Sequence, residues 1–158
     1  MPETVQTGVD GLDSILGGGI VNNATVLVSG NPGTGKSLFG INYLYSGVID
    51  HGERGIYISF EENAADIRMA AESIGFDRFG ELVDDDEIKI YDKREMLQDG
   101  NFTETMDRLL EVFTESEYDR LVLDSLTMFQ LFFEDEREKR TYLLKFSDIL
   151  KQHGLTSL

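Results

Sequence analysis

Short runs of β-branched and other apolar residues alternate along the chain with stretches whose apolar residues recur at helical spacing. Strands that alternate with helices in this way are typical of an α/β fold with a mostly parallel sheet and crossover helices. The first run leads directly into a glycine-rich turn, which indicates a central strand, and the third alternates with charge, which indicates an edge strand. The four runs expected to form strands are 24–29 (ATVLVS), 55–60 (GIYISF), 87–91 (EIKIY) and 120–123 (RLVL).

Helices are expected between and after these strands. Residues 36–49 are apolar almost all round, which predicts a buried helix directly after the glycine-rich turn. Apolar residues at helical spacing mark one inner face in each of three further helices. Those faces are Ile67, Ala70, Ala71 and Ile74; Met106, Leu109, Leu110 and Phe113; and Tyr142, Phe146, Ile149 and Leu150.

Length and composition favour a single soluble domain over residues 1–158. A hydrophobic share of 41% is ordinary for a folded protein. No apolar run approaches the roughly 20 residues needed to cross a bilayer. Met1 to Thr7 lack the basic and apolar regions of a secretory signal, so the cytoplasm is the default location. The sequence contains no cysteine, which excludes disulfides and thiolate metal sites and fits a reducing compartment.

Acidic residues outnumber basic ones by 30 to 14, which gives a formal net charge of −16. The acidic residues are spread along the whole chain, so they indicate a solvated acidic surface. Such a surface repels the phosphates of nucleic acids, whose neutralisation supplies most non-specific affinity. The charge therefore weighs against a nucleic-acid partner.

Residues 30–37 (GNPGTGKS) match the P-loop pattern Gly-x-x-x-x-Gly-Lys-Ser/Thr and lie between a predicted strand and a predicted helix. Glycines let the backbone curl so that successive N–H groups point at phosphate oxygens, and the following helix adds its positive N-terminal end. A flexible glycine-rich turn is the alternative interpretation. The placement between strand and helix favours a site for ATP with Mg²⁺.

Two side chains of this loop have specific expected roles. Lys36 would reach the β and γ phosphates and support catalysis there, and the Ser37 hydroxyl would be a Mg²⁺ ligand. The residues expected to contact the nucleotide are Gly30, Asn31, Pro32, Gly33, Thr34, Gly35, Lys36, Ser37 and Leu38.

The apolar run Leu121 to Leu123 ends in Asp124, where a buried strand would deliver its carboxyl end beside the P-loop. We expect Asp124 to hold the Mg²⁺ through a water, with help from a bond to Ser37. A turn-forming aspartate is the alternative. The P-loop upstream in the same alternating pattern favours the metal role.

Glu61 and Glu62 follow the second predicted strand directly, where the ligand crevice of an open α/β sheet is found. One of them, with Glu61 slightly preferred, would orient and deprotonate the attacking water. The alternative is that they are first-turn acids of the next helix, which the helix dipole favours.

Four stretches resemble the KaiC-like ATPases of the RecA/RadA superfamily. They are 7–20 (TGVDGLDSILGGGI), the P-loop, 57–63 (YISFEEN) and 123–126 (LDSL). The resemblance implies a three-layer RecA-like P-loop fold, with a mostly parallel central sheet and helices on both faces. It also implies a homo-oligomer, hexameric or filamentous, in which ATP lies between neighbouring subunits.

Residues 155–158 (LTSL) look like the opening of a fifth strand, so we expect the chain to be part of a longer ATPase domain whose C-terminal strands lie beyond Leu158. The leading hypothesis is a KaiC-like regulatory ATPase that binds ATP with Mg²⁺ and hydrolyses it slowly. A RadA-type recombinase paralogue acting on DNA and a non-hydrolysing nucleotide switch are the alternatives.

Overall fold

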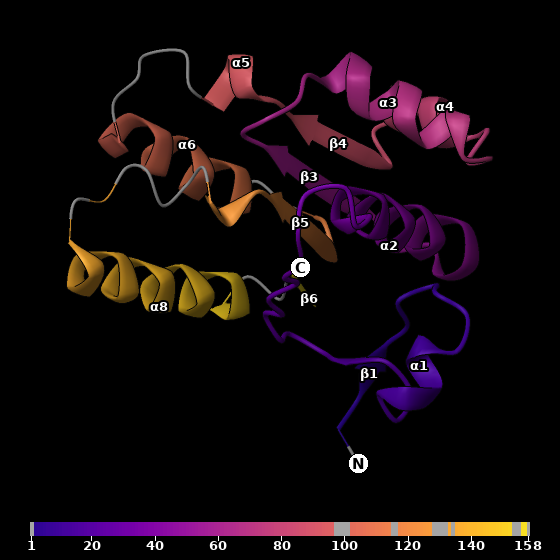
Figure 1. The fold of residues 1–158 in the computed structure, drawn as a ribbon, viewed down its shortest axis with the longest axis horizontal. Helices are drawn as coiled ribbons and strands as arrows, with labels where there is room; N and C mark the ends of the chain where they lie inside the picture. Colours follow the sequence, from indigo (N-terminus) through magenta and orange to yellow (C-terminus); the bar gives the residue numbers. More distant parts are fainter. Residues whose placement is uncertain are drawn as a thin grey trace.

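The structure is a computed structural model that describes residues 2–96, 102–114, 117–127, 133, 135–152 and 156–157. At its centre lies a parallel sheet, shown in Figure 1, in the order β4, β3, β5, β6. These strands are β4 (Ile88–Tyr91), β3 (Gly55–Ser59), β5 (Arg120–Asp124) and β6 (Thr156–Ser157). Ser59 lies opposite Asp124 in the register of β3 and β5, so both strands end at the same edge of the sheet.

Helices cover both faces of this sheet (Figure 1). One face packs against α2 (Lys36–His51), α3 (Ala64–Ser73) and α4 (Phe79–Asp84), and the other against α6 (Phe102–Thr114) and α8 (Glu136–Gln152). A hydrophobic core lies on each side of the sheet. Successive side chains of β3 point to opposite faces, so Ile56 and Ile58 pack in one core and Tyr57 packs in the other. The expected α/β architecture with helices on both faces is confirmed.

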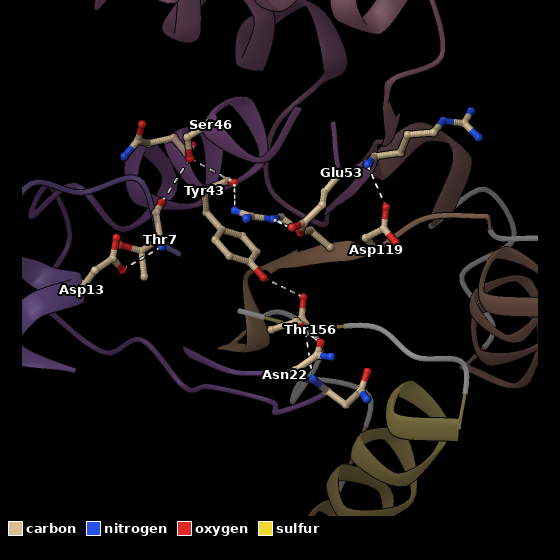
Figure 2. A network of polar contacts seen from close by, with 12 residues as sticks. Thr7, Asp13, Asn22, Tyr43, Ser46, Glu53, Asp119 and Thr156 are labelled. Atoms are coloured by element: carbon tan, nitrogen blue, oxygen red, sulfur yellow. Dashed lines mark hydrogen bonds and ion pairs between the residues drawn. The ribbon is translucent and has the colours of Figure 1, made fainter. Parts of the chain in front are cut away.

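The N-terminal segment forms a small unit beside α2. In it β1 (Thr4–Val5) pairs antiparallel with β2 (Ile20–Val21), and α1 (Leu12–Ile15) lies between them in sequence. The segment approaches α2 so closely that a Cβ atom on Gly8 would lie 2.0 Å from Ser46 Oγ. Ser46 Oγ donates a hydrogen bond to the Thr7 carbonyl at 3.3 Å, and Thr7 N–H donates to Asp13 at 2.8 Å, as drawn in Figure 2. A glycine at position 8 is therefore what lets this segment lie against the helix.

The expected central strand at 24–29 is wrong. Within this range only Thr25 makes an isolated bridge, and the Leu27 side chain is 72% exposed. A groove of about 450 Å³ separates the segment from β5 and α8, and Val26, Val122 and Phe146 are among its lining residues. In its described residues β6 pairs only with Arg120 and Leu121 of β5. Residues 24–29 do not form a strand because no neighbouring strand in the described part of the chain lies alongside them to complete a ladder.

The other expected elements are confirmed, with differences at their ends and faces. β4 is the edge strand, as expected. β3 ends one residue before the expected end and β5 one residue after it, and the helix expected at 36–49 continues to His51. That helix is buried on one face only, since Leu38 is 37% and Ile49 is 40% exposed. Ile74 is 45% exposed because α3 has already ended at Ser73. Two parts of the expected pattern lie outside the described residues. They are the Met106 side chain on the inner face of its helix, and Leu155 and Leu158 at the ends of the expected fifth strand.

The sequence pattern did not reveal α4, the one-turn helix α5 (Lys93–Met96), or the elements of the N-terminal unit. Each is a short element of six residues or fewer. Such elements contain too few residues for a period to emerge. Among the described helices, none combines the length and the apolar character needed to span a bilayer.

A buried arginine, Arg120, begins β5, and Asp124 ends the same strand. The Arg120 side chain is fully buried, and its Nε donates to Glu53 at 2.8 Å while Nη1 donates to the Tyr43 carbonyl at 2.8 Å. The guanidinium also lies 4.6 Å from the centre of the Tyr43 ring. Gly47 provides the room, because a Cβ atom there would lie 2.6 Å from Arg120 Nε. These contacts tie the start of β5 to α2 through Tyr43 and to the loop after α2 through Glu53.

The same tyrosine extends the contacts to the C-terminal strand. Tyr43 Oη donates to the Thr156 carbonyl at 3.0 Å, and Thr156 Oγ1 donates to Asn22 Oδ1 at 3.1 Å (Figure 2). The backbone N–H of Asn23 donates to Thr156 Oγ1 at 3.0 Å. These bonds connect the N-terminal unit, α2 and β6 at this end of the sheet.

Candidate functional site

The loop 30–37 leads from the N-terminal unit into the first turn of α2. Gly33 and Gly35 have φ angles of 80° and 92°, in the left-handed region that favours glycine. Thr34 turns back on Asn31, whose carbonyl accepts from Thr34 Oγ1 at 2.7 Å and from its N–H at 3.3 Å. Residues 30–34 are exposed, so the loop presents its backbone to solvent at the start of a helix.

Lys36 and Leu38 point to different surroundings. Lys36 Nζ donates to the carbonyls of Gly30 at 2.7 Å and Asn31 at 3.0 Å, so the ammonium group lies over the loop. The Leu38 side chain is exposed on α2. The structure therefore places the lysine charge at the loop, while the expected contact of Lys36 with the β and γ phosphates stays a prediction.

Ser37 and Asp124 meet across α2 and β5, although they are separated by 87 positions in the sequence. Ser37 Oγ donates to Asp124 Oδ2 at 2.7 Å. The strand delivers the carboxylate here because Asp124 is the last residue of β5 and α2 begins just before Ser37. The expected bond between these two side chains is confirmed, while their metal role stays a prediction.

A third side chain joins this pair. Tyr57, on β3, donates its phenol hydrogen to the same oxygen, Asp124 Oδ2, at 2.6 Å. Burial raises the pKa of Tyr57 far above its usual value, and the negative charge of Asp124 and the hydrogen bond to it act in the same direction. Tyr57 is therefore a neutral phenol that donates its hydrogen to the carboxylate.

Glu61 and Glu62 lie at the same edge of the sheet, in the loop before α3. Glu61 Oε1 accepts a hydrogen bond from Ser125 Oγ at 2.7 Å, so the residue after Asp124 holds the first glutamate. The backbone N–H of Glu62 donates to Ser59 Oγ at 3.0 Å. Because α3 begins only at Ala64, the alternative that both glutamates are first-turn acids of that helix is wrong.

The two glutamates differ in their electrostatic surroundings. Partial burial raises the pKa of Glu62, and the negative charges of Asp124, Asp66 and Glu61 raise it further. Glu61 has its own hydrogen-bond donor in Ser125. The site thus combines a positioned carboxylate with a second one whose ionisation is disfavoured.

Asp92 fixes the loop that carries these glutamates. Its side chain is buried, and its Oδ2 accepts from the Ala64 N–H at 3.0 Å, at the first residue of α3. Its Oδ1 accepts from the N–H groups of Arg94 at 3.0 Å and Glu95 at 3.3 Å. Burial acts to raise the pKa of Asp92, but these three backbone donors outweigh it and hold the pKa below its usual range.

We expect Asp92→Asn to destabilise the protein by about 1–2 kcal/mol at pH 7, since one carboxylate completes two helix starts. A lowered carboxyl pKa contributes stability above the unfolded pKa, and this stability is lost as the pH falls through the folded value. The difference from wild type should therefore shrink below a pH of roughly 4. Urea unfolding at pH 7 and pH 3 measures it, with the exposed Asp148→Asn as control. A difference that is independent of pH would contradict the charge-based explanation.

The donor set fits a nucleoside triphosphate with Mg²⁺. An exposed glycine-rich loop at a helix N-terminus, with an ammonium group over it, is suited to phosphate oxygens. A hydroxyl and a carboxylate 2.7 Å apart supply the hard oxygen ligands that Mg²⁺ takes from a protein beside substrate phosphates. The residues present therefore suit both groups.

Sequence reasoning singled out the loop, Asp124 and the two glutamates, but it gave no role to Tyr57, Ser125 or Asp92. A signal for Tyr57 exists, because it lies two positions before Ser59 on β3 and shares its face. Ser59 is opposite Asp124, so the register of the two strands would have placed the phenol near that carboxylate. That register is not visible in the sequence.

Comparison with known proteins identifies the family of this chain. The family model described as "ATPase: KaiC" matches residues 5–158. The circadian clock oscillator protein KaiC of Parathermosynechococcus lividus is 33% identical over 97% of this chain, which spans 29% of that relative's length. A UPF0273 protein of Pyrococcus furiosus is 32% identical over 100% of this chain, and the match covers 68% of that relative's length.

A solved structure shows the same fold. The crystal structure of a KaiC-like protein from Pyrococcus horikoshii matches with a TM-score of 0.84 and 32% identity, over 99% of this chain and 69% of that one. The match of the family model to nearly the whole chain, the P. furiosus relative and this shared fold lead to one conclusion. The chain belongs to the KaiC ATPase family.

Proposed function

We propose that this chain binds ATP with Mg²⁺ at loop 30–37 and hydrolyses it slowly, as part of a KaiC-like regulatory ATPase. The observation that supports this most directly is the 2.7 Å bond between Ser37 and Asp124 beside a complete P-loop. It brings together the two side chains that hold the metal in P-loop proteins. Family membership supports the same assignment.

In this proposal the loop binds the phosphates of ATP. The backbone N–H groups of residues 30–35, except Pro32, which has none, and the N-terminal end of α2 would donate to phosphate oxygens. Lys36 would exchange its bonds to the Gly30 and Asn31 carbonyls for the terminal phosphates. Its charge would then offset the negative charge that builds during phosphoryl transfer.

The metal would be held by Ser37 and, through water, by Asp124. When bound, Mg²⁺ would neutralise negative charge on the terminal phosphates of ATP. Ser37 Oγ keeps its hydrogen on Asp124 Oδ2 while a lone pair remains for a cation. The carboxylate thus orients the hydroxyl as a ligand.

Hydrolysis needs a base for the attacking water, and we assign that role to Glu61. Ser125 holds Oε1 of Glu61, which leaves Oε2 as the acceptor for a water proton. Glu62 lies next to it, and its raised pKa alone would also suit a base. Positioning favours the first glutamate, because a base must lie within hydrogen-bond reach of the proton it takes.

Calorimetry of ATP binding to the 158-residue protein tests the proposal. Heat is expected with ATP and Mg²⁺, and chelation of Mg²⁺ should weaken binding. Lys36→Ala should weaken it about 30-fold, because a charged hydrogen bond to phosphate is worth roughly 2 kcal/mol. The exposed Lys151→Ala on α8 is the matched control and should bind like wild type. Absence of heat in the folded wild type would refute the proposal.

Further outcomes separate this function from its alternatives. Tight ATP binding without measurable turnover would favour a nucleotide-dependent switch. A DNA recombinase is disfavoured by the net charge of −16, and salt-dependent DNA binding would be needed to revive it. Assembly into a ring or filament of identical subunits belongs to the same proposal, and light scattering with and without ATP would measure it.

A further inference from the structure

We propose that Tyr57 is a positioning residue for the metal site, because its phenol hydroxyl fixes the carboxylate of Asp124 in the orientation that receives Mg²⁺. The inference rests on the proposed function, since it concerns the metal that accompanies ATP. Tyr57 would act through Asp124, without contact with the metal or the phosphates.

The hydrogen bonds at Asp124 carry the inference. Both hydroxyl donors, Ser37 at 2.7 Å and Tyr57 at 2.6 Å, converge on Oδ2. They come from different elements, α2 and β3, so the carboxylate is held from two sides. A carboxylate oxygen accepts about two hydrogen bonds, so these donors saturate Oδ2. Oδ1 is then the oxygen left to accept from a water on the metal.

The fold delivers the phenol to this point through the packing of α2 on the sheet. Tyr57 is fully buried and lies opposite Val122 in the register of β3 and β5. Gly40 of α2 packs directly over both: a Cβ atom there would lie 2.7 Å from Val122 Cγ1 and 3.7 Å from Tyr57 Cε2. The ring therefore passes beneath the helix at the position where glycine leaves space.

The hydroxyl is separable from the ring. A phenylalanine at position 57 would keep the apolar contacts of the ring with α2 and lose only the bond to Asp124. One donor would then remain on Oδ2, and the carboxylate would turn more freely about its terminal bond. Loss of a hydrogen-bond partner behind a direct metal ligand lowers metal affinity about 10- to 100-fold, and we expect the lower end here because Asp124 would reach the metal through water.

The experiment compares Tyr57→Phe with Tyr43→Phe in the 158-residue protein. Tyr43 is an equally buried tyrosine whose hydroxyl donates to the Thr156 carbonyl at 3.0 Å, at the other end of β5. Both variants lose one buried hydroxyl bond, and only one of them loses it at Asp124. The probe is the fluorescent analogue mant-ATP, titrated at a series of free Mg²⁺ concentrations and in excess EDTA.

Tyr57→Phe is expected to raise the half-saturating Mg²⁺ concentration about tenfold and to leave binding in EDTA unchanged. Tyr43→Phe should lower the melting temperature without moving the Mg²⁺ dependence. An unchanged Mg²⁺ dependence in folded Tyr57→Phe, or an equal shift in both variants, would overturn the inference. Wild-type protein that does not bind the probe at any Mg²⁺ concentration would instead refute the proposed function.

A second measurement covers the case in which Tyr57→Phe does not fold. Addition of Mg²⁺ to the ATP complex should perturb the near-ultraviolet absorption of Tyr57, because its acceptor carboxylate gains a cation. The perturbation is expected in wild type and in Tyr43→Phe alike. Its absence from both proteins, when ATP binding depends on Mg²⁺, would overturn the inference.

Discussion

Glu61→Gln should slow ATP turnover about a thousandfold, while the affinity for ATP stays close to that of wild type. Glutamine keeps the size of the side chain and can still accept from Ser125, but it cannot take a proton from water. General-base catalysis contributes about 10²–10⁴-fold to rate, so the loss should fall within that range. Single-turnover measurement with labelled ATP follows rates that are too slow for steady-state assays.

The neighbouring glutamate provides the control for this prediction. Glu62→Gln has the same charge change one residue away and should cost less than tenfold, because Glu62 is assigned no proton transfer. Ser125→Ala should give an intermediate loss, since Glu61 would keep its basicity and lose its donor. A larger loss for Glu62→Gln than for Glu61→Gln would assign the base to the second glutamate.

Glu53→Ala is expected to lower the free energy of unfolding by roughly 3 kcal/mol, although Glu53 pairs with Arg120 at the start of β5 and Asp124 lies at the other end of that strand. The variant leaves Arg120, whose side chain is fully buried, without its anion. Removal of one partner of a buried ion pair costs about 3–5 kcal/mol, and the lower end applies because Glu53 is 31% exposed. Urea unfolding followed by circular dichroism measures the change.

Two further variants test the reason for this loss. The Glu117 side chain is 92% exposed, and its Oε2 lies 3.8 Å from Arg54 Nη1. Glu117→Ala should therefore lower the free energy of unfolding by less than about 1 kcal/mol. Combining Glu53→Ala with Arg120→Met should recover part of the stability, because the uncompensated charge is removed. A double variant less stable than Glu53→Ala alone would contradict this account.

The chemistry of the site could be predicted from the sequence because it lies in contiguous motifs. The P-loop is eight consecutive residues, and Asp124 directly ends an apolar run. Strands and helices with a clear period were also predicted, and so was the edge position of β4. In each case neighbouring residues alone carry the signal.

What the sequence did not predict depends on residues far apart in the chain. Residues 24–29 have the composition of a strand, but a strand forms only where a neighbour completes its hydrogen bonds, and their side toward β5 is a groove. Tyr57 reads as one more apolar residue until the register of β3 and β5 is known. Arg120 begins a strand and reads as a solvated charge until Glu53 and Gly47 are seen beside it.

Three contacts along α2 match three positions of β5. Gly47 lies over Arg120, Gly40 over Val122, and Ser37 bonds to Asp124. From Ser37 to Gly47 the helix rises about 15 Å, at 1.5 Å per residue. From Arg120 to Asp124 the strand rises about 13 Å, at about 3.3 Å per residue. The two segments therefore have nearly the same length, so the three contacts can form together. Because Arg120, Val122 and Asp124 alternate onto one face, a slip of β5 by one residue would turn the carboxylate away from Ser37. The two glycines and the buried arginine thus fix the register of β5 against α2. That register determines whether Ser37 and Asp124 lie close enough to serve as the proposed metal site.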